Sequence, residues 1–463
     1  MKMNLKGIFY MSEKKARGSV DLLNGPILKG LILFMIPIVI SSAFQQLYNA
    51  VDTAIVGNVL GENSLAAIGA CASVFEMMVG FCTSLGNGFA MVAARSFGSG
   101  DEDKMKRSVA GSIVIGLITC AVLTILSMLF LRPLLQLINT PASILDESYA
   151  YIRVIGMWLI VMFIYNMCSG MLRSIGNSLM PLVFLIISSI LNIFLDLLLI
   201  KTFNMGVVGA AVATVIAQGV SAVLCIIYIL RETKVLIPSR KHFNVGADLY
   251  KDLAGQGYSM AFMGSIVSIG SITLQSGINS LGEMIIAGHV AARKIYMLFN
   301  LPFISMGLAV STFISQNKGA NKGKRILKAM KLAYIYDFIG AAAVTAILLL
   351  FGREFIHLIT GSTNDVILSN GSRYLYLVGP FYAVLGVLMQ TRFALQGLGS
   401  KLIPLISSVI ELVGKIIFTI LLIPKFGYNA VIFCEPVIWC FMTAQLLYAF
   451  NTNKYIREVR AEA

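Results

Sequence analysis

The sequence predicts an all-α polytopic membrane protein with twelve transmembrane helices, in two six-helix lobes related by a pseudo-two-fold axis along the membrane normal. Three observations predict it. Of 463 residues, 57% are apolar and 13% are charged, whereas soluble domains use about 25% charged residues. Twelve stretches are long enough to span a bilayer, which takes about 20 apolar residues. The second half of the chain also repeats motifs of the first.

The predicted spans divide the chain into five regions. We expect a cytoplasmic N-terminal segment (1–27), an N-lobe (28–230), an inter-lobe loop (231–254), a C-lobe (255–450) and a C-terminal tail (451–463). The N-terminus is polar and basic, which argues against a cleavable signal peptide, and Met11 is a second plausible start after Met1. The spans are residues 28–57, 64–95, 108–131, 149–171, 180–200, 206–230, 255–281, 284–316, 329–352, 372–396, 402–424 and 428–450.

Lysine and arginine predict the orientation. The N-terminus and the loops after even-numbered spans hold 25 of them, while the loops after odd-numbered spans hold four: Arg132, Lys201, Arg353 and Lys425. Cytoplasmic loops are enriched in basic residues. We therefore expect both termini in the cytoplasm and the chain in the inner (plasma) membrane. The net charge of +14 is then a topology signal, and no nucleic-acid partner is expected.

The duplication is visible in two motifs. LRSIGNSLMP (172–181) matches LQGLGSKLIP (395–404) at a shift of 223, and the stretch from Ser84 to Gly98 matches that from Ser305 to Gly319 at a shift of 221. Each half therefore has six helices. Because six is even, both halves keep the same orientation, which is a known plan for transporters.

The informative residues are those that the two halves do not share. The first span carries Asp52, and the fifth carries Asn192 and Asp196 on one helical face. The matching positions in the second half are Thr273, Lys415 and Thr419. Intramembrane carboxylates are costly unless they face a cavity, a partner or an ion. These oxygens suit an alkali cation or a bound proton.

Two further residues complete this predicted site. Thr214 in the sixth span adds a hydroxyl, although its small-residue surroundings also fit helix packing. Pro37 removes a backbone hydrogen bond from the first span and permits a bend.

At these residues the chain resembles the multidrug and toxic compound extrusion (MATE) transporters, in particular the DinF-like and MepA-like bacterial branch. The resemblance rests on LYNAVDTAIVG in the first span, NIFLD in the fifth, GAAVAT in the sixth and the LRSIGNSLMP loop. It implies a cation-coupling site at Asp52, Asn192, Asp196 and Thr214, with Pro37 at a hinge. The NorM branch relies on an acid in the seventh span, which GSIVSIGSITLQSG lacks here.

Other polar residues of the spans have two interpretations each. Glu76 either binds cationic drugs or pairs with a basic group, and Glu411 with Lys415 fits an internal ion pair at i,i+4 spacing. Arg293 and Lys294 are expected to extend toward the membrane surface. The remaining candidates for a substrate cavity, which packing between helices would equally explain, are Gln45, Tyr48, Asn49, Tyr151, Tyr165 and Asn166.

The chain has no signature of catalysis. It contains no Walker loop and no HExxH motif, and its seven cysteines form no CxxC pair and fit small core residues. We therefore expect no enzyme activity, no cofactor and no metal beyond a possible Na⁺ at the coupling residues.

The resemblance implies a secondary active exporter of amphipathic, mostly cationic drugs in exchange for H⁺ or Na⁺ by alternating access. We expect it to act as a monomer in the lipid bilayer. The alternatives are a lipid-linked oligosaccharide flippase of the wider superfamily and a non-transporting receptor or scaffold.

Overall fold

The computed structural model describes residues 18–462, and the regular structure within that range is helical throughout. The choice of start between Met1 and Met11, and the five basic residues of the first seventeen, lie outside the described residues.

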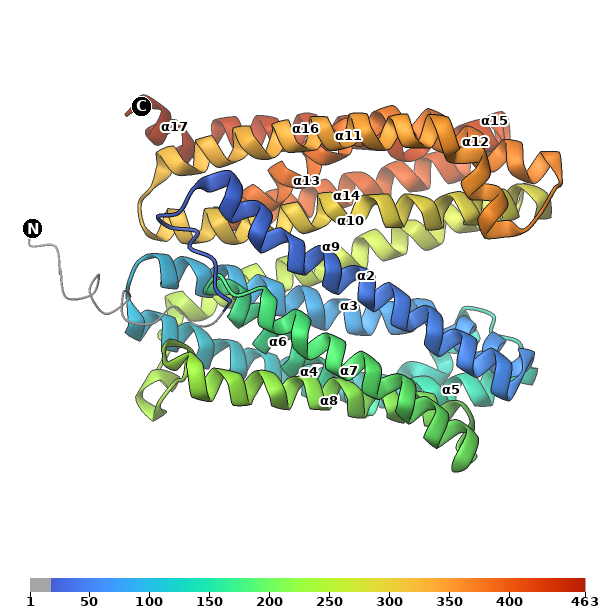
Figure 1. The fold of residues 1–463 in the computed structure, drawn as a ribbon, viewed down its shortest axis with the longest axis horizontal. Coiled ribbons are helices and arrows are strands. Elements are labelled where there is room, and N and C mark those ends of the chain that lie inside the picture. Colours follow the sequence, from blue (N-terminus) through green and yellow to red (C-terminus); the bar gives the residue numbers. More distant parts are fainter. Residues whose placement is uncertain (1–17, 463) are drawn as a thin grey trace, which may run out of the picture. The chain divides into compact units, whose positions relative to one another are not determined.

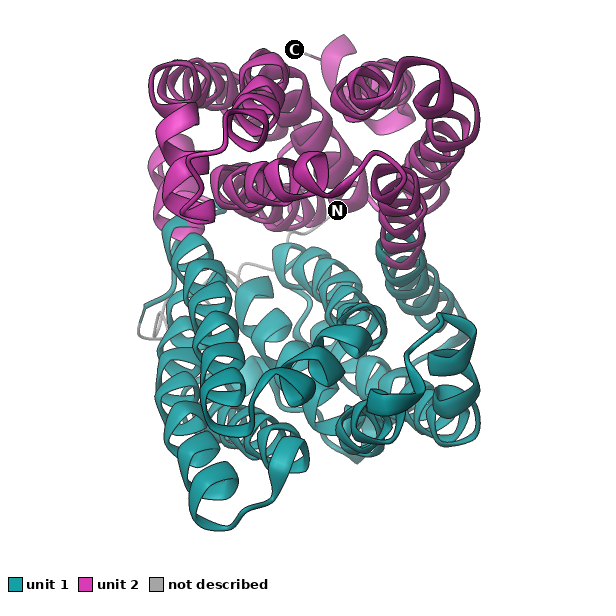
Figure 2. Cartoon of the chain, turned by 90° about the vertical axis from the view of Figure 1, so that its right-hand side faces the viewer, with its two compact units in different colours: residues 1–23, 36–264 teal, residues 24–35, 265–463 magenta. Residues whose placement is uncertain are grey.

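The described chain forms two compact units (Figure 2). Unit 1 holds the residues up to Leu23 together with Ile36–Gly264, and unit 2 holds Asn24–Met35 and Ser265–Ala463. Two long helices pass from one unit to the other. Helix α2 (Ile27–Leu60) does so directly before Pro37, and helix α9 (Ala247–Asn279) does so directly after Gly264.

Unit 1 is a bundle of long helices that lie side by side (Figure 1). Helix α3 packs on α4, α5 and α6, while α7 packs on α8. Glycines allow the closest approach: a Cβ at Gly86 would lie 3.2 Å from the backbone of Asn166, so α3 and α6 meet almost backbone to backbone. The elements are α3 (Glu62–Gly98), α4 (Glu102–Leu137), α5 (Ala142–Met157), α6 (Leu159–Ser174), α7 (Leu179–Asp196), η1 (Leu197–Thr202), α8 (Gly206–Glu232), η2 (Lys234–Leu236) and η3 (Arg240–Phe243).

Unit 2 follows the same plan. Helix α10 packs on α11, α12 and α13, and α16 packs on α13 and α14. A short C-terminal helix contacts the start of α11, where a Cβ at Gly323 would meet Val459. The elements are α10 (Glu283–Gly319), α11 (Gly323–Thr360), α12 (Asp365–Val378), η4 (Gly379–Phe381), α13 (Tyr382–Gly397), α14 (Leu402–Ile417), η5 (Phe418–Leu422), α15 (Ile423–Phe426), α16 (Tyr428–Thr452) and α17 (Lys454–Ala461).

The helices account for the predicted spans with one modification. Within the described range, eleven helices are long and apolar enough to cross a membrane, and a bent pair makes up to twelve. That pair is α5 and α6, which meet at 49° around Trp158 where a single span was predicted at 149–171. The predicted inter-lobe loop is also shorter, because α9 already begins at Ala247.

The duplication extends to backbone irregularities. The fifth helix of each half ends in π-helical turns, η1 and η5, and the fourth is interrupted in each half, at Trp158 and at η4. Glycines with positive φ also recur at matching places: Gly61 (89°) and Gly282 (97°), and Gly206 (58°) and Gly427 (56°). Such φ values favour glycine, so the two units share a backbone design.

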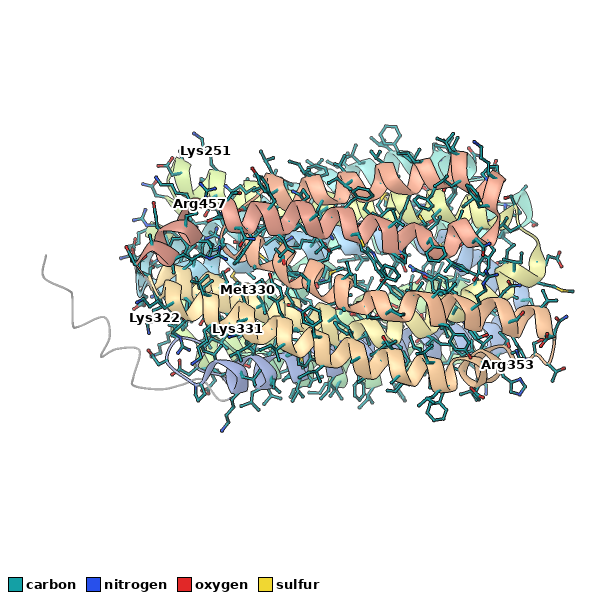
Figure 3. The ribbon with its side chains drawn as sticks, turned by 90° about the horizontal axis from the view of Figure 1, so that it is seen from above. Lys251, Lys322, Met330, Lys331, Arg353 and Arg457 are labelled. Atoms are coloured by element: carbon teal, nitrogen blue, oxygen red, sulfur yellow. The ribbon has the colours of Figure 1, made fainter. Side chains whose placement is uncertain are left out.

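The basic residues of unit 2 separate along its helices. Figure 3 shows Lys322, Lys331 and Arg457 near one end and Arg353 at the other. The six cysteines other than Cys440 are buried as small core residues, whereas Cys440 on α16 is exposed.

Candidate functional site

The centre of the candidate site is a pair of carboxyl groups in unit 1. Asp196, the last residue of α7, is fully buried, and Asp52 approaches it from α2. The two carboxyl groups are close enough for a hydrogen bond. Such a bond requires a proton on one of them, because two ionised carboxylates only accept and repel each other. The structure thus brings together the two acids that the sequence singled out.

Asn192 lies one turn before Asp196 on the same face of α7. Its side chain is 1% exposed. Apart from the contact between the two carboxyl groups, both polar atoms of Asn192, both carboxylate oxygens of Asp196 and Oδ1 of Asp52 are buried without a hydrogen-bond partner within residues 18–462. Buried polar groups are nearly always satisfied, so this cluster is prepared for something other than protein. The π-helical turn η1 begins directly after Asp196, and π-turns often occur at functional sites.

A small polar cavity is lined by Asn192, one helical turn before Asp196. Its volume is about 10 Å³, which suffices for roughly one water-sized occupant. Thr214 donates its hydroxyl proton to the Ala210 carbonyl at 3.0 Å, so its oxygen lone pairs remain for another partner. The lining residues are Tyr48, Leu185, Ser188, Ser189, Asn192, Thr214, Ala217 and Gln218.

Gln218 is a member of this site that sequence reasoning missed. It lines the cavity together with Tyr48 and leaves its own Oε1 buried without a partner in the described chain. The signal was present, because Gln218 follows Thr214 by one helical turn and must share its face.

Basic side chains are absent from this cluster. Across the described residues, no Lys, Arg or His lies within 4 Å of a carboxylate oxygen of Asp52 or Asp196. The buried guanidinium of unit 1, Arg173, instead donates to Ser169 at 2.7 Å and to Asn87 at 2.9 Å. Buried acids without a basic partner need neutralisation by a proton or a cation.

The tyrosines predicted to line the site divide into near and distant ones. Tyr48 is 9% exposed and Tyr151 on α5 is 6% exposed. Both lie close enough to Asp52 and Asp196 to interact with them electrostatically. Tyr165 on α6 is also buried, at 8% exposed, and it does not line the small cavity beside Asn192.

The remaining candidates of unit 1 lie away from the acids. Asn166 donates to the Met162 carbonyl at 2.8 Å on the α3 side of α6. Gln45 and Asn49 on α2 are exposed, whereas Tyr48 is buried. Glu76 is exposed on α3 and forms no ion pair with the described residues, and its role in binding a drug stays a prediction.

Pro37 lies inside a continuous helix. Helix α2 runs unbroken through it, and Ser41 donates its hydroxyl to the Pro37 carbonyl at 2.8 Å. The prolyl nitrogen cannot bond to the preceding turn, so the helix is weakest where it passes between the units.

In unit 2 the predicted pair of Glu411 and Lys415 belongs to a larger cluster. Lys415 lies 2.9 Å from Glu411 and 3.7 Å from Glu435, and Glu435 lies 2.6 Å from Arg293. The expectation that Arg293 extends to the membrane surface is wrong, because Glu435 on α16 holds it in the bundle. Glu435 itself was missed, since nothing local in the sequence predicts a partner 142 residues away.

This cluster occupies the place that corresponds to the acid site of unit 1. Lys415 corresponds to Asn192, and Glu435 corresponds to Thr214 by alignment on Gly206 and Gly427. Two acids face two bases, so the cluster is neutral. At these positions unit 2 therefore has ion pairs between its own side chains, whereas unit 1 has buried acids without a basic partner among the described residues.

Comparison with known proteins agrees with this duplicated plan. The family model MatE matches residues 37–198 and again 259–421. The chain is 26% identical to the probable multidrug resistance protein YpnP of Bacillus subtilis, covering 82% of this chain and 83% of that one. It is 23% identical to the multidrug export protein MepA of Staphylococcus saprophyticus, covering 91% and 92%. A crystal structure of MATE in the bent conformation superposes with a TM-score of 0.87 at 24% identity, covering 97% and 99% of the two chains.

Proposed function

This chain belongs to the MatE family of membrane transporters, and we propose that it exports amphipathic, mostly cationic compounds in exchange for H⁺ or Na⁺. It spans the membrane with eleven or twelve helices. The names of its relatives, a multidrug resistance protein and a multidrug export protein, support small-molecule drugs as the substrates.

One observation supports ion coupling above the others. Asp52 and Asp196 adjoin each other without a basic neighbour in the described chain, beside oxygens of Asn192 and Thr214 that have unused acceptor capacity. A cation or proton from outside would neutralise this site, and its loss would restore the negative charge. The cavity has room for about one small occupant, which fits a dehydrated Na⁺ or a water beside a protonated acid.

Coupling follows if ion and drug favour different conformations. A ligand shifts an equilibrium only by its differential affinity for the two states. Asp52 and Pro37 share helix α2, so neutralising Asp52 changes how strongly the second part of α2 holds to unit 1. Bending near Pro37 then alters the face of α2 that carries Gln45 and Asn49, which with Glu76 are the exposed polar groups available to a drug.

The decisive experiment is flux in proteoliposomes. Purified protein should accumulate ethidium, an organic cation, when a pH or Na⁺ gradient is imposed, and the effective gradient identifies the coupling ion. Asp52→Asn and Asp196→Asn should each abolish gradient-driven flux with normal membrane insertion. A matched control is Asp146→Asn, an exposed acid paired only with Arg132, which should leave flux unchanged.

Other outcomes would redirect the assignment. Gradient-driven flux that persists in both Asp52→Asn and Asp196→Asn would contradict the coupling site. Ethidium flux that is absent under every gradient, with scrambling of a lipid-linked oligosaccharide instead, would favour a flippase. Inertness toward both would favour a receptor or scaffold.

We also propose that both termini face the cytoplasm of a plasma-membrane monomer. The concentration of basic residues at one end of unit 2, at Lys322, Lys331 and Arg457, supports this orientation.

A further inference from the structure

Unit 2 contains a buried carboxyl group that lies outside the ion cluster. Asp337 occupies the middle of the 38-residue helix α11 and is 0% exposed. Sequence reasoning did not single it out, and its counterparts in the first half are the apolar Ile115 or Gly116. Asp337 belongs to a helix against which both α10 and α13 pack.

Only one of the two carboxylate oxygens of Asp337 has a hydrogen-bond partner among the described residues. Gln390 on α13 donates its amide to Oδ1 of Asp337 at 3.1 Å and also to the Phe303 carbonyl at 3.3 Å. Oδ2 of Asp337 and Oε1 of Gln390 have no hydrogen-bond partner among residues 18–462. Gly386 makes the necessary room, because a Cβ there would lie 2.7 Å from the Cβ of Asp337.

Charged groups on the surrounding helices face elsewhere. On α11 itself, Tyr334 pairs its hydroxyl with Thr391 at 2.8 Å. On α13, Arg392 donates to Ser407 at 3.0 Å and to Ser408 at 2.5 Å. On α10, the backbone carbonyl of Phe303 accepts from Gln390 at 3.3 Å. Two other titratable groups are nearby. Tyr336 on α11 is close enough to Asp337 for an electrostatic interaction, and Arg460 on α17 interacts electrostatically with Tyr334.

No Lys, Arg or His of the described chain lies within 4 Å of Asp337. An ionised carboxylate at this depth is strongly disfavoured without a counter-charge. The carboxyl group is therefore neutral in this conformation. In a purely structural role, both oxygens of the carboxyl group would be expected to form hydrogen bonds, whereas among residues 18–462 Oδ2 of Asp337 and Oε1 of Gln390 have no partner.

We propose that Asp337 is a reversible proton-binding site of unit 2, with Gln390 as its positioning residue. The proton adds to Oδ2 of the carboxylate and leaves from it to water, and no other bond changes. A metal ion does not fit, because hard cations take about six oxygen ligands and the side chains here offer two or three. This inference rests on ion-coupled export and deepens it: unit 2 contributes a proton to the cycle although its ion cluster is neutral.

The fold supplies a means of releasing the proton. Helix α13 begins after the 3₁₀ turn η4, which contains Pro380, and Gln390 lies about two turns further on. A change of direction at η4 moves Gln390 relative to Asp337 and opens the carboxyl group to water. The proton affinity of Asp337 then differs between conformations, which is the requirement for coupling.

The test uses Asp337→Asn in the full chain. Asparagine keeps the acceptor for Gln390 and the shape beside Gly386, so folding should persist, as a thermal melt would verify. In pH-difference infrared spectra, a band from a protonated carboxyl should disappear and return reversibly with pH. The band should survive in Asp52→Asn/Asp196→Asn and be missing in Asp337→Asn. Its absence from the double variant, or a band that no pH change removes from the folded protein, would overturn the proposal.

A second measurement counts protons. In Na⁺-free proteoliposomes, Asp337→Asn should lower the number of protons moved per ethidium by about one. The control is Arg392→Gln, which should leave this number unchanged because Arg392 bonds to Ser407 and Ser408 and not to Asp337. An unchanged count in Asp337→Asn would show a purely structural carboxyl. If the unsubstituted protein moves no ethidium under any gradient, ion-coupled export fails, while the infrared titration still decides whether Asp337 exchanges its proton.

Discussion

Within the neutral ion cluster of unit 2, we expect substitution of Glu435 to cost more stability than substitution of Glu411. Glu435→Gln removes the partner of Arg293 at 2.6 Å and one of the two partners of Lys415, at 3.7 Å. Glu411→Gln removes only the contact to Lys415 at 2.9 Å. At an effective dielectric of about 20, the lost attractions are roughly 11 kcal/mol for Glu435 and roughly 6 kcal/mol for Glu411, before solvation is counted.

Solvation reduces both values but keeps their order. Breaking a buried ion pair by removing one partner costs about 3–5 kcal/mol, which we assign to Glu435→Gln because its neighbours are at most 24% exposed. For Glu411→Gln we expect about half of that, since Lys415 retains Glu435. At about 2–4 °C per kcal/mol for a body of this size, Glu435→Gln should lower the melting temperature by roughly 6–20 °C.

The assay is thermal unfolding of the purified protein in detergent, followed by the fraction that remains monodisperse. The double variant Glu411→Gln/Lys415→Gln is the informative comparison, because it removes a charge of each sign and leaves the pair of Arg293 and Glu435 intact. It should melt above Glu435→Gln. Glu283→Gln, an exposed acid at the start of α10, is the control. A melting temperature for Glu435→Gln equal to that of the control would refute the reasoning.

Three further predictions concern unit 1 and the topology. The side chain of Lys241 is 73% exposed, and Lys241→Cys should react with impermeant thiol reagents only in inverted vesicles. Thr363→Cys, in the loop after α11, should instead react in intact cells. Both variants are made in a Cys440→Ser background, because Cys440 is exposed, and the opposite labelling pattern would reverse the orientation. Thr214→Val keeps the shape but removes a hydroxyl from the cavity, so the ion concentration for half-maximal flux should rise several-fold, and an unchanged value would exclude Thr214 as a ligand. Pro37→Ala restores a backbone hydrogen bond in α2 and should slow ethidium flux without lowering the melting temperature, and full-speed flux would remove the hinge role.

Helical periodicity explains what could be predicted from the sequence. Asn192 and Asp196 are four residues apart, so any helix places them on one face, and the structure places Asp52 against that face. The same rule separates Tyr165 from Asn166, which are adjacent in sequence and hence about 100° apart on a helix. In the structure Tyr165 is accordingly buried, whereas Asn166 is partly exposed.

The rest depended on pairing between distant helices. Arg293 and Glu435 are 142 residues apart, and Asp337 and Gln390 are 53 apart. Each of these residues is an ordinary intramembrane polar residue until its partner is known. The interruption at Trp158 was missed for a related reason, because neither Gly nor Pro stands at the break and only the equivalent turn at Pro380 hints at it.

The duplication turns these details into an argument about division of labour. A shared backbone, with its π-turns and positive-φ glycines, presents oxygen ligands in unit 1 at positions where unit 2 presents Lys415 and Glu435. A buried lysine at the position of Asn192 would repel a bound cation by roughly 4 kcal/mol at 4 Å and a dielectric of about 20, so the two chemistries cannot occupy the same site. Unit 2 can therefore respond to ions only at a position outside the duplicated pattern. Asp337 is such a position, because the first half has no acid there. We therefore propose that two units with one fold hold two different ion-responsive groups.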